Sequence, residues 1–307
     1  MPQWVVVVFG GNREMKLRAA IVAVALAVVA TGCGLHTLTP PGSAPLRYRD
    51  QVFANVTKTA DVSYGSSVDQ NGTTQDLKLD IYEPAGDANT KRPVMVWVHG
   101  GGFSGGDKTS GEIVSEANDM AKKGYFNVSI NYRLYGPGCS ASGGGSQVGC
   151  IQAMIDAQHD AQAAVRFLRK NAATYKIDSN RIAMGGSSAG AITAAHVAAN
   201  SEDPGTSGNP GFSSAIKGAV SLSGAKVIGA PMTSTDAPIL MFHGTADPLV
   251  PYQWAVNTLD QANAAGVIAY LTTYQGEGHV PFNHYEQIFA QQTNFLYWVM
   301  DLQHAST

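Results

Sequence analysis

The sequence predicts an α/β domain built on a mainly parallel sheet with helices on both faces. Short apolar segments alternate with longer segments of good helix formers along most of the chain, as expected for successive βα units. Residues 93–99 are almost wholly apolar, which is typical of a strand buried on both faces of a sheet. With 307 residues, 44% of them hydrophobic, the chain is long enough for one large domain of this class.

The first two strands are expected to form an antiparallel pair. Residues 60–65 and 76–82 alternate apolar and polar side chains, and Asn71-Gly72 between them is a turn signal. The later elements are predicted, in order, as strand 93–99, helix 113–123, strand 126–132, helix 151–173, strand 181–184, helix 191–199, strand 216–222, strand 238–242, helix 252–265, strand 268–274 and helix 283–302. Residues 203–211, rich in Gly and Pro, are predicted to form a surface turn cluster.

A strand, a tight turn and a helix meet at Ser188. Gly186 and Gly190 stand two residues before and two after it, a spacing that fits a nucleophile elbow, in which the serine hydroxyl is held exposed above the sheet. The N–H of Ala189, at the start of the helix, is then placed to face a developing oxyanion. A turn that merely joins two elements is the alternative interpretation of this short pattern.

A nucleophilic serine needs a base and a carboxylate, and these are expected at the ends of later strands. Asp247 follows the strand 238–242 and His279 follows the strand 268–274, which gives the order Ser, Asp, His. His284 is the rival base, while Asp236 and Glu277 are rival acids. His243, at the end of a strand, is assigned a structural role.

The segment His99-Gly-Gly-Gly-Phe103 directly follows the buried strand. Its glycines allow backbone N–H groups to approach a substrate oxygen, so Gly101, Gly102 and Ala189 are the predicted oxyanion donors. A phosphate-binding loop is disfavoured because Asp107 stands where a lysine would be needed. The net charge of −3 and the absence of a basic cluster argue against a nucleic-acid partner.

The first 33 residues are expected to be a signal peptide. Lys16 and Arg18 precede the apolar run 19–30, which is too short to span a membrane comfortably. Residues 30–33, Ala-Thr-Gly-Cys, resemble a bacterial lipobox with Ala30 where leucine is more usual, which implies lipidation of Cys33. The charges follow Met15, so translation is predicted to begin there. Residues 34–58 are assigned to a tether and N-terminal segment, and 59–307 to the catalytic domain.

The number of cysteines is consistent with an exported protein. If Cys33 carries lipid, Cys139 and Cys150 remain as one pair and bracket a Gly/Ser-rich loop. A disulfide between them is expected to stabilise the fold, with a reduced pair as the alternative.

Four motifs in order resemble the α/β-hydrolase-fold carboxylesterases of the hormone-sensitive-lipase-like and feruloyl-esterase-like branches. The motifs are residues 99–103, 131–133 (Asn-Tyr-Arg), 186–190, and Asp247 with His279. The resemblance spans about residues 62–302 and implies acylation of Ser188, with His279 as base and then acid. It implies no metal or organic cofactor.

One departure bears on the substrate. Only about fifteen residues (223–237) separate two strands where many relatives insert a helical cap, so little or no cap domain is expected. An open groove suits short-acyl or aryl esters, including small-molecule esters and ester groups borne by a polysaccharide. Phe103, Tyr135, Tyr252 and Trp254 are candidate pocket walls, and the loop between Cys139 and Cys150 is a candidate rim. The alternatives are a serine peptidase of the same fold and a non-catalytic binding lipoprotein.

Overall fold

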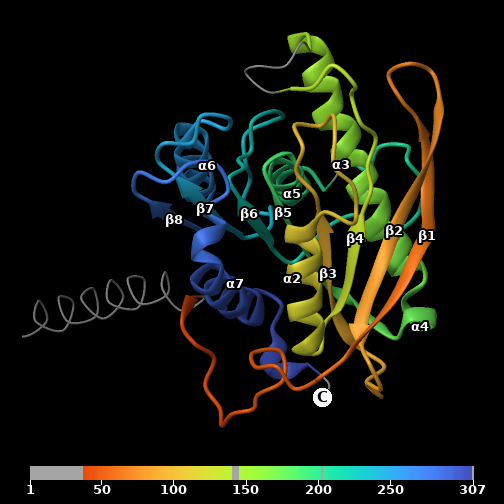
Figure 1. The fold of residues 1–307 in the computed structure, drawn as a ribbon, viewed down its shortest axis with the longest axis vertical. Coiled ribbons are helices and arrows are strands. Elements are labelled where there is room, and N and C mark those ends of the chain that lie inside the picture. The colour runs from red at the N-terminus through yellow and green to blue at the C-terminus, as the bar shows by residue number, and fades with distance from the viewer. Residues whose placement is uncertain (1–36, 140–144, 202, 306–307) are drawn as a thin grey trace, which may run out of the picture.

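The computed structural model describes residues 37–139, 145–201 and 203–305, which form an eight-stranded sheet flanked by helices (Figure 1). The strand order is β1-β2-β4-β3-β5-β6-β7-β8. The pairs β1–β2 and β2–β4 are antiparallel, and every pair from β4–β3 to β7–β8 is parallel. The predicted α/β architecture is therefore confirmed.

The strands are β1 (Val56–Val68), β2 (Thr74–Pro84), β3 (Arg92–Val98), β4 (Phe126–Ile130), β5 (Ile177–Ser187), β6 (Ala219–Leu222), β7 (Ile239–Gly244) and β8 (Ala269–Tyr274). The α-helices are α2 (Gly111–Lys122), α3 (Gln147–Lys170), α4 (Ala172–Tyr175), α5 (Ala189–Ala199), α6 (Tyr252–Ala265) and α7 (Tyr285–Val299).

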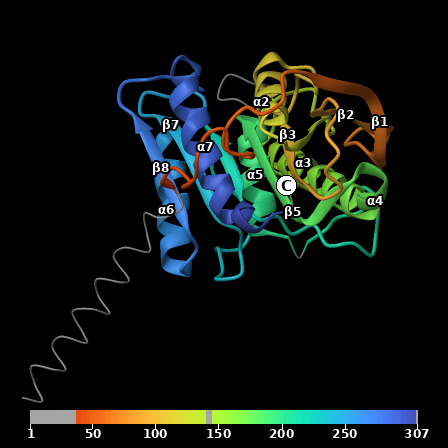
Figure 2. The same ribbon diagram turned by 90° about the horizontal axis from the view of Figure 1, so that it is seen from below.

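Helices cover both faces of the sheet, with α2 and α7 on one face and α3, α5 and α6 on the other (Figure 2). The alternation along β3 explains why the strand reads as continuously apolar. Val94, Val96 and Val98 pack into the core beneath α3 and α5, whereas Met95 and Trp97 pack into the core beneath α2 and α7.

The folded body begins upstream of residue 59. Tyr48 is buried, and its backbone N–H donates to Lys123 O at 2.8 Å. Arg47 forms an ion pair with Asp87 at 2.5 Å. Part of the segment assigned to the tether and N-terminal region thus packs on the body, because it has an aromatic side chain to bury and a carboxylate to pair with.

Most predicted elements appear with shifted ends. The closing helix, predicted over residues 283–302, is shorter because residues 282–284 form a separate 3₁₀ turn and α7 ends at Val299. Residues 223–237, all of which the structure describes, contain no helix, as the sequence predicts. Among the described residues, no helix combines the length and apolar character needed to cross a bilayer.

Candidate active site

Ser188 occupies the sharp turn between β5 and α5. Its backbone has φ 53° and ψ −118°, an uncommon conformation for a non-glycine residue, and its N–H donates to Leu222 O at 2.8 Å. Gly190 must be a glycine because a Cβ there would lie 2.7 Å from His99 O. The elbow predicted from the sequence is present and packs directly against the end of β3.

The three side chains predicted to act together are in hydrogen-bond contact. Ser188 Oγ lies 2.8 Å from His279 Nε2, and His279 Nδ1 lies 2.8 Å from Asp247 Oδ2. A carboxylate only accepts, so Nδ1 carries the hydrogen and Nε2 is left to accept the Ser188 proton. The Asp247 carboxylate is fully buried, while the His279 ring is 17% exposed and open to the pocket.

Asp247 is held as a carboxylate. Its burial alone would raise its pKa, but hydrogen bonds from His243 and His279 and from the N–H groups of Leu249 and Val250 outweigh burial and hold the pKa of Asp247 well below its usual range. A charged acid is what orients a histidine base and stabilises the imidazolium that forms on it.

His243 contributes more than its predicted structural role. Its Nε2 lies 2.8 Å from Val250 O and 3.1 Å from Asp247 Oδ2, so the acid contacts two histidines. The sequence places His243 at the end of β7, but nothing in its spacing indicated this contact.

The rival residues lie in other contacts. His284 pairs with Glu277 at 3.2 Å and stacks on Tyr274. Asp236 accepts from the N–H of Thr233 at 2.8 Å. The hydrogen-bonding groups of these rival residues are therefore paired with residues other than Ser188.

Three residues that line the pocket beside the nucleophile carry the predicted oxyanion donors. Within the described residues, no hydrogen bond uses the N–H of Gly101, Gly102 or Ala189. The carbonyl of Gly101 accepts from two N–H groups of the following turn, and that of Gly102 accepts from Cys139 N at 3.0 Å. These carbonyls are turned into the protein, and all three residues line the pocket that holds Ser188.

The Asn-Tyr-Arg motif supports this loop from behind. Tyr132 stacks on His99 at 4.4 Å between ring centroids, and its hydroxyl donates to His99 O at 3.1 Å. Burial lowers the pKa of His99, and its Nδ1 donates to Gly100 O at 2.7 Å. The stacked rings of His99 and Tyr132 therefore support the glycine loop.

Residues 203–211 form the predicted turn segment, most of it exposed or half-buried, but one of its side chains has a buried role that the composition did not indicate. Ser207 is fully buried and donates to Asp160 at 2.6 Å, and the same carboxylate pairs with Arg133 at 2.8 Å. A buried arginine and carboxylate need further polar partners, and the turn supplies one. The loop thus joins α3 to the segment that supports the glycines.

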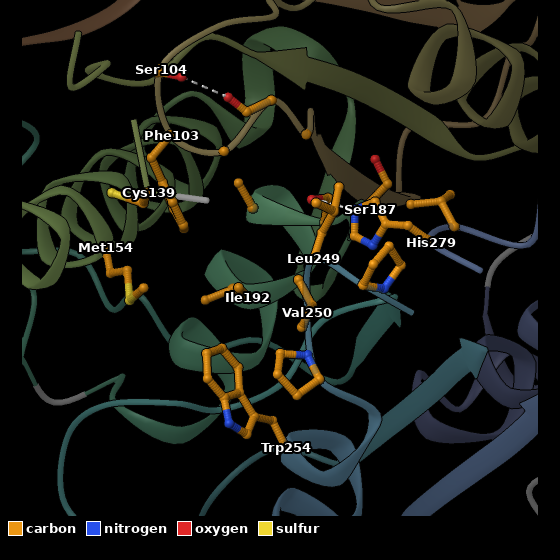
Figure 3. Close-up of a pocket in the computed structure, with 18 of the residues that line it drawn as sticks. Phe103, Ser104, Cys139, Met154, Ser187, Ile192, Leu249, Val250, Trp254 and His279 are labelled. Atoms are coloured by element: carbon orange, nitrogen blue, oxygen red, sulfur yellow. Dashed lines mark hydrogen bonds between the residues drawn. The ribbon is translucent and has the colours of Figure 1, made fainter. Parts of the chain in front are cut away.

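The pocket around Ser188 has a volume of about 700 Å³ (Figure 3). Of the four predicted walls, Phe103 and Trp254 line it and Tyr135 and Tyr252 do not. Its remaining lining includes the glycine loop, Cys139, Met154, Ile192, residues 248–251, His279 and Val280.

One carboxylate in the pocket was not predicted. Glu112, in the first turn of α2, lines the pocket and accepts a hydrogen bond from the hydroxyl of Ser187, the residue before the nucleophile. Its position on an ordinary amphipathic helix gave no sequence signal. It places a carboxylate beside the nucleophile.

The structure pairs Cys139 with Cys150 in a disulfide, with their Cα atoms 5.3 Å apart. Cys139 lines the pocket, so the disulfide borders it, while residues 140–144 of the loop predicted as a rim fall outside the described residues. Met15, Cys33 and the rest of the predicted signal peptide fall outside the described residues.

Comparisons with known proteins match this chain to hydrolases and esterases. Residues 79–226 match the family model described as BD-FAE, and residues 222–294 match the TAP-like protein model. The chain is 36% identical over 124 residues to phenmedipham hydrolase of Pseudarthrobacter oxydans and 34% identical over 128 residues to fumonisin B1 esterase of Sphingopyxis macrogoltabida. These matches cover 40% and 39% of this chain but only 23% and 22% of the relatives' own length.

Solved structures share the fold over more of the chain. A thermophilic esterase of Thermogutta terrifontis superposes with a TM-score of 0.63 at 22% identity, covering 82% of this chain and 95% of its own. A truncated carbohydrate esterase from gut microbiota superposes with a TM-score of 0.62 at 21% identity, covering 82% of this chain and 98% of its own.

Proposed function

We propose that this chain, which has the α/β-hydrolase fold, is a serine carboxylic-ester hydrolase. The observation that carries the proposal is the pair of 2.8 Å contacts that link Ser188 through His279 to Asp247. Beside them lie three N–H groups that have no partner in the part of the chain that the structure describes. Such an arrangement activates a hydroxyl nucleophile and stabilises an oxyanion.

In the proposed reaction, Ser188 Oγ attacks the ester carbonyl while His279 Nε2 takes its proton. The oxyanion is held by the N–H groups of Gly101, Gly102 and Ala189. The imidazolium, stabilised by Asp247, gives the proton to the leaving alcohol as the ester C–O bond breaks. Water, deprotonated by His279, then hydrolyses the acyl-enzyme and returns Ser188 to its starting state.

The substrates proposed are short-acyl or aryl esters, free or attached to a polysaccharide. The open pocket, the short connection 223–237 without a helical cap, and the apolar wall of Phe103, Ile192 and Trp254 support this range. The names of relatives that act on phenmedipham, fumonisin and carbohydrate esters favour small-molecule and sugar-borne esters as the first substrates to test.

The decisive assay is hydrolysis of p-nitrophenyl esters from acetate to palmitate by the wild-type chain and by Ser188→Ala. The variant should lose at least about 10⁴ in kcat. Equal inertness of both proteins on every ester would favour the binding-lipoprotein alternative. Cleavage of peptide anilides but not of esters, lost in Ser188→Ala, would favour a peptidase.

We also propose that the chain is exported and anchored to the cell envelope through lipid on Cys33. The lipobox-like residues 30–33 support the anchor, and the disulfide supports an oxidising compartment. Feeding cells an alkyne fatty acid should label the wild-type protein but not Cys33→Ala. Equal labelling of the two would remove the proposal.

A further inference from the structure

A second groove adjoins the catalytic pocket. It has a volume of about 490 Å³ and lies between the first half of α3 and α6, with residues 226–228 also lining it. Met154 and Trp254 line both cavities. Cys139 lines the first and its disulfide partner Cys150 the second, so the two cavities meet along this line. Figure 3 shows Met154 and Trp254 on the side of the pocket away from His279.

Helix periodicity gives the groove two facing walls. Trp254, Asn257 and Gln261 are spaced i, i+3, i+7 on α6, which places them on one face of that helix. On α3, Gln147 and Met154 are likewise seven residues apart, with Ile151 between them. Each wall therefore presents at least one neutral amide and one large apolar side chain.

The charges around the groove exclude an ionic ligand. Of the described residues that line it, none is an aspartate or a glutamate. Lys226 is the one cation among them, but it is buried, its ammonium donates to Ile228 O at 3.2 Å, and burial lowers its pKa. An anion would find no accessible positive charge here, and a cation no carboxylate.

The same lining disfavours an acyl chain. Gln147, Asn257 and Gln261 each carry an amide. The Oδ1 of Asn257 already accepts from Gln253 Nε2 at 3.0 Å, but a hydrocarbon would offer no partner to its NH₂ group or to the amides of the two glutamines. A sugar ring satisfies both kinds of surface. Its hydroxyls both donate and accept, and its C–H face packs on an aromatic plane such as the indole of Trp254, which is 39% exposed.

We propose that this groove binds a neutral sugar unit next to the esterified sugar of the substrate. The inference rests on the proposed esterase function, because it takes the ester to lie in the adjoining pocket at Ser188. It adds the direction in which a carbohydrate chain extends from the site, along α6 and past the disulfide.

Binding is tested first, in the full chain carrying Ser188→Ala so that no turnover occurs. Titration with neutral xylotriose or cellotriose should change the tryptophan emission, because Trp254 is exposed in the groove while Trp97 is buried. Adding Trp254→Phe should abolish the change, whereas adding Trp298→Phe, on α7, should preserve it. A charged trisaccharide of uronic acids should bind at least about 10-fold more weakly, since no accessible cation lines the groove.

Kinetics give an independent readout. The ratio of kcat/KM for acetylated xylotriose to that for p-nitrophenyl acetate should fall about 10-fold in Asn257→Ala and in Gln261→Ala. The matched control is Asn263→Ala, which removes an exposed amide from the same helix outside the groove and should leave the ratio unchanged. Unfolding temperatures of all variants verify the fold.

The outcomes separate the two proposals. An active esterase whose emission and substrate ratio do not respond to the sugar or to these variants would overturn the sugar subsite and leave the esterase proposal intact. A chain inert on every ester that still binds the trisaccharide through Trp254 would support the sugar site while removing the esterase. A larger effect of Asn257→Ala on palmitate than on sugar esters would also overturn the subsite.

Discussion

His243 Nε2 lies 3.1 Å from Asp247 Oδ2, the same oxygen that His279 contacts from the other side. The other neighbour of His243 Nε2 is the Val250 carbonyl, which also only accepts, so this nitrogen carries a hydrogen shared between two acceptors. His243 is fully buried and cannot move aside. It therefore fixes the carboxylate that orients the base.

Replacing His243 is expected to weaken catalysis without abolishing it. In His243→Phe the acid keeps its contacts with His279 and with the N–H groups of Leu249 and Val250 but loses one donor, so kcat should fall about 10- to 100-fold. In Asp247→Asn the loss should approach about 10⁴. Steady-state rates on p-nitrophenyl butyrate measure the kcat of both variants. A kcat equal to that of the wild type in His243→Phe would show that the contact between His243 and Asp247 does not contribute to catalysis.

The two glycine donors are expected to differ in tolerance to a methyl group. At Gly101 (φ +109°) a Cβ collides with the carbonyl oxygen of Gly105, whereas at Gly102 (φ +59°) the nearest atom is Ser104 Oγ at 4.0 Å. Gly102→Ala should cost about 1–2 kcal/mol of stability and retain activity. Gly101→Ala should displace the donor and lose about 10²-fold or more in kcat. The reverse ranking in kcat and unfolding temperature would contradict the assignment.

Reducing the disulfide between Cys139 and Cys150 should lower stability. The bridge joins residues 11 apart, and closing a loop of that size contributes about 2–3 kcal/mol by restricting the unfolded chain. Dithiothreitol should lower the unfolding temperature of the wild type by roughly 5 °C. The double variant Cys139→Ser/Cys150→Ser should unfold at the reduced temperature with or without the reagent, and a shift in that variant would point to another cause.

Glu116 should make stability fall as the pH rises. Burial, aided by the charge of Asp119 and opposed by the hydrogen bond from Gln292, raises the pKa of Glu116 from 4.5 to about 8. The folded state therefore retains a proton that the unfolded chain releases, so stability is lost between these two pH values.

The matched variant for this effect is Glu116→Gln, which keeps the shape and removes the proton. Its unfolding temperature should exceed that of the wild type at pH 8, with the difference shrinking toward pH 5. Parallel curves for the two proteins across this range would show that Glu116 is not responsible.

Local patterns in the sequence were sufficient to predict the three residues of the triad. Ser188 is marked by flanking glycines, and Asp247 and His279 by their places just after strands. Because parallel strands end at one edge of the sheet, residues in those places converge whatever the details of packing. The structure brings these three together as predicted.

Contacts that depend on packing between distant segments could not be predicted. Glu112 on α2 accepts a hydrogen bond from Ser187 at the end of β5, and Ser207 joins a buried ion pair from a loop whose composition indicates only a turn. Neither contact leaves a periodicity or spacing in the chain, since each depends on where α2 and residues 203–211 lie in three dimensions.

The base is supplied by the segment that follows β8, which pairs with β7 and forms one edge of the sheet that the structure describes. The hydrogen bond between Ser188 and His279 spans 91 residues. A chain still emerging from a ribosome thus holds its nucleophile before it holds a base, and the triad is incomplete until β8 and the segment after it dock. Ester hydrolysis would then report complete folding. A chain divided between α6 and β8 would serve as a split reporter that becomes active only when its two fragments associate.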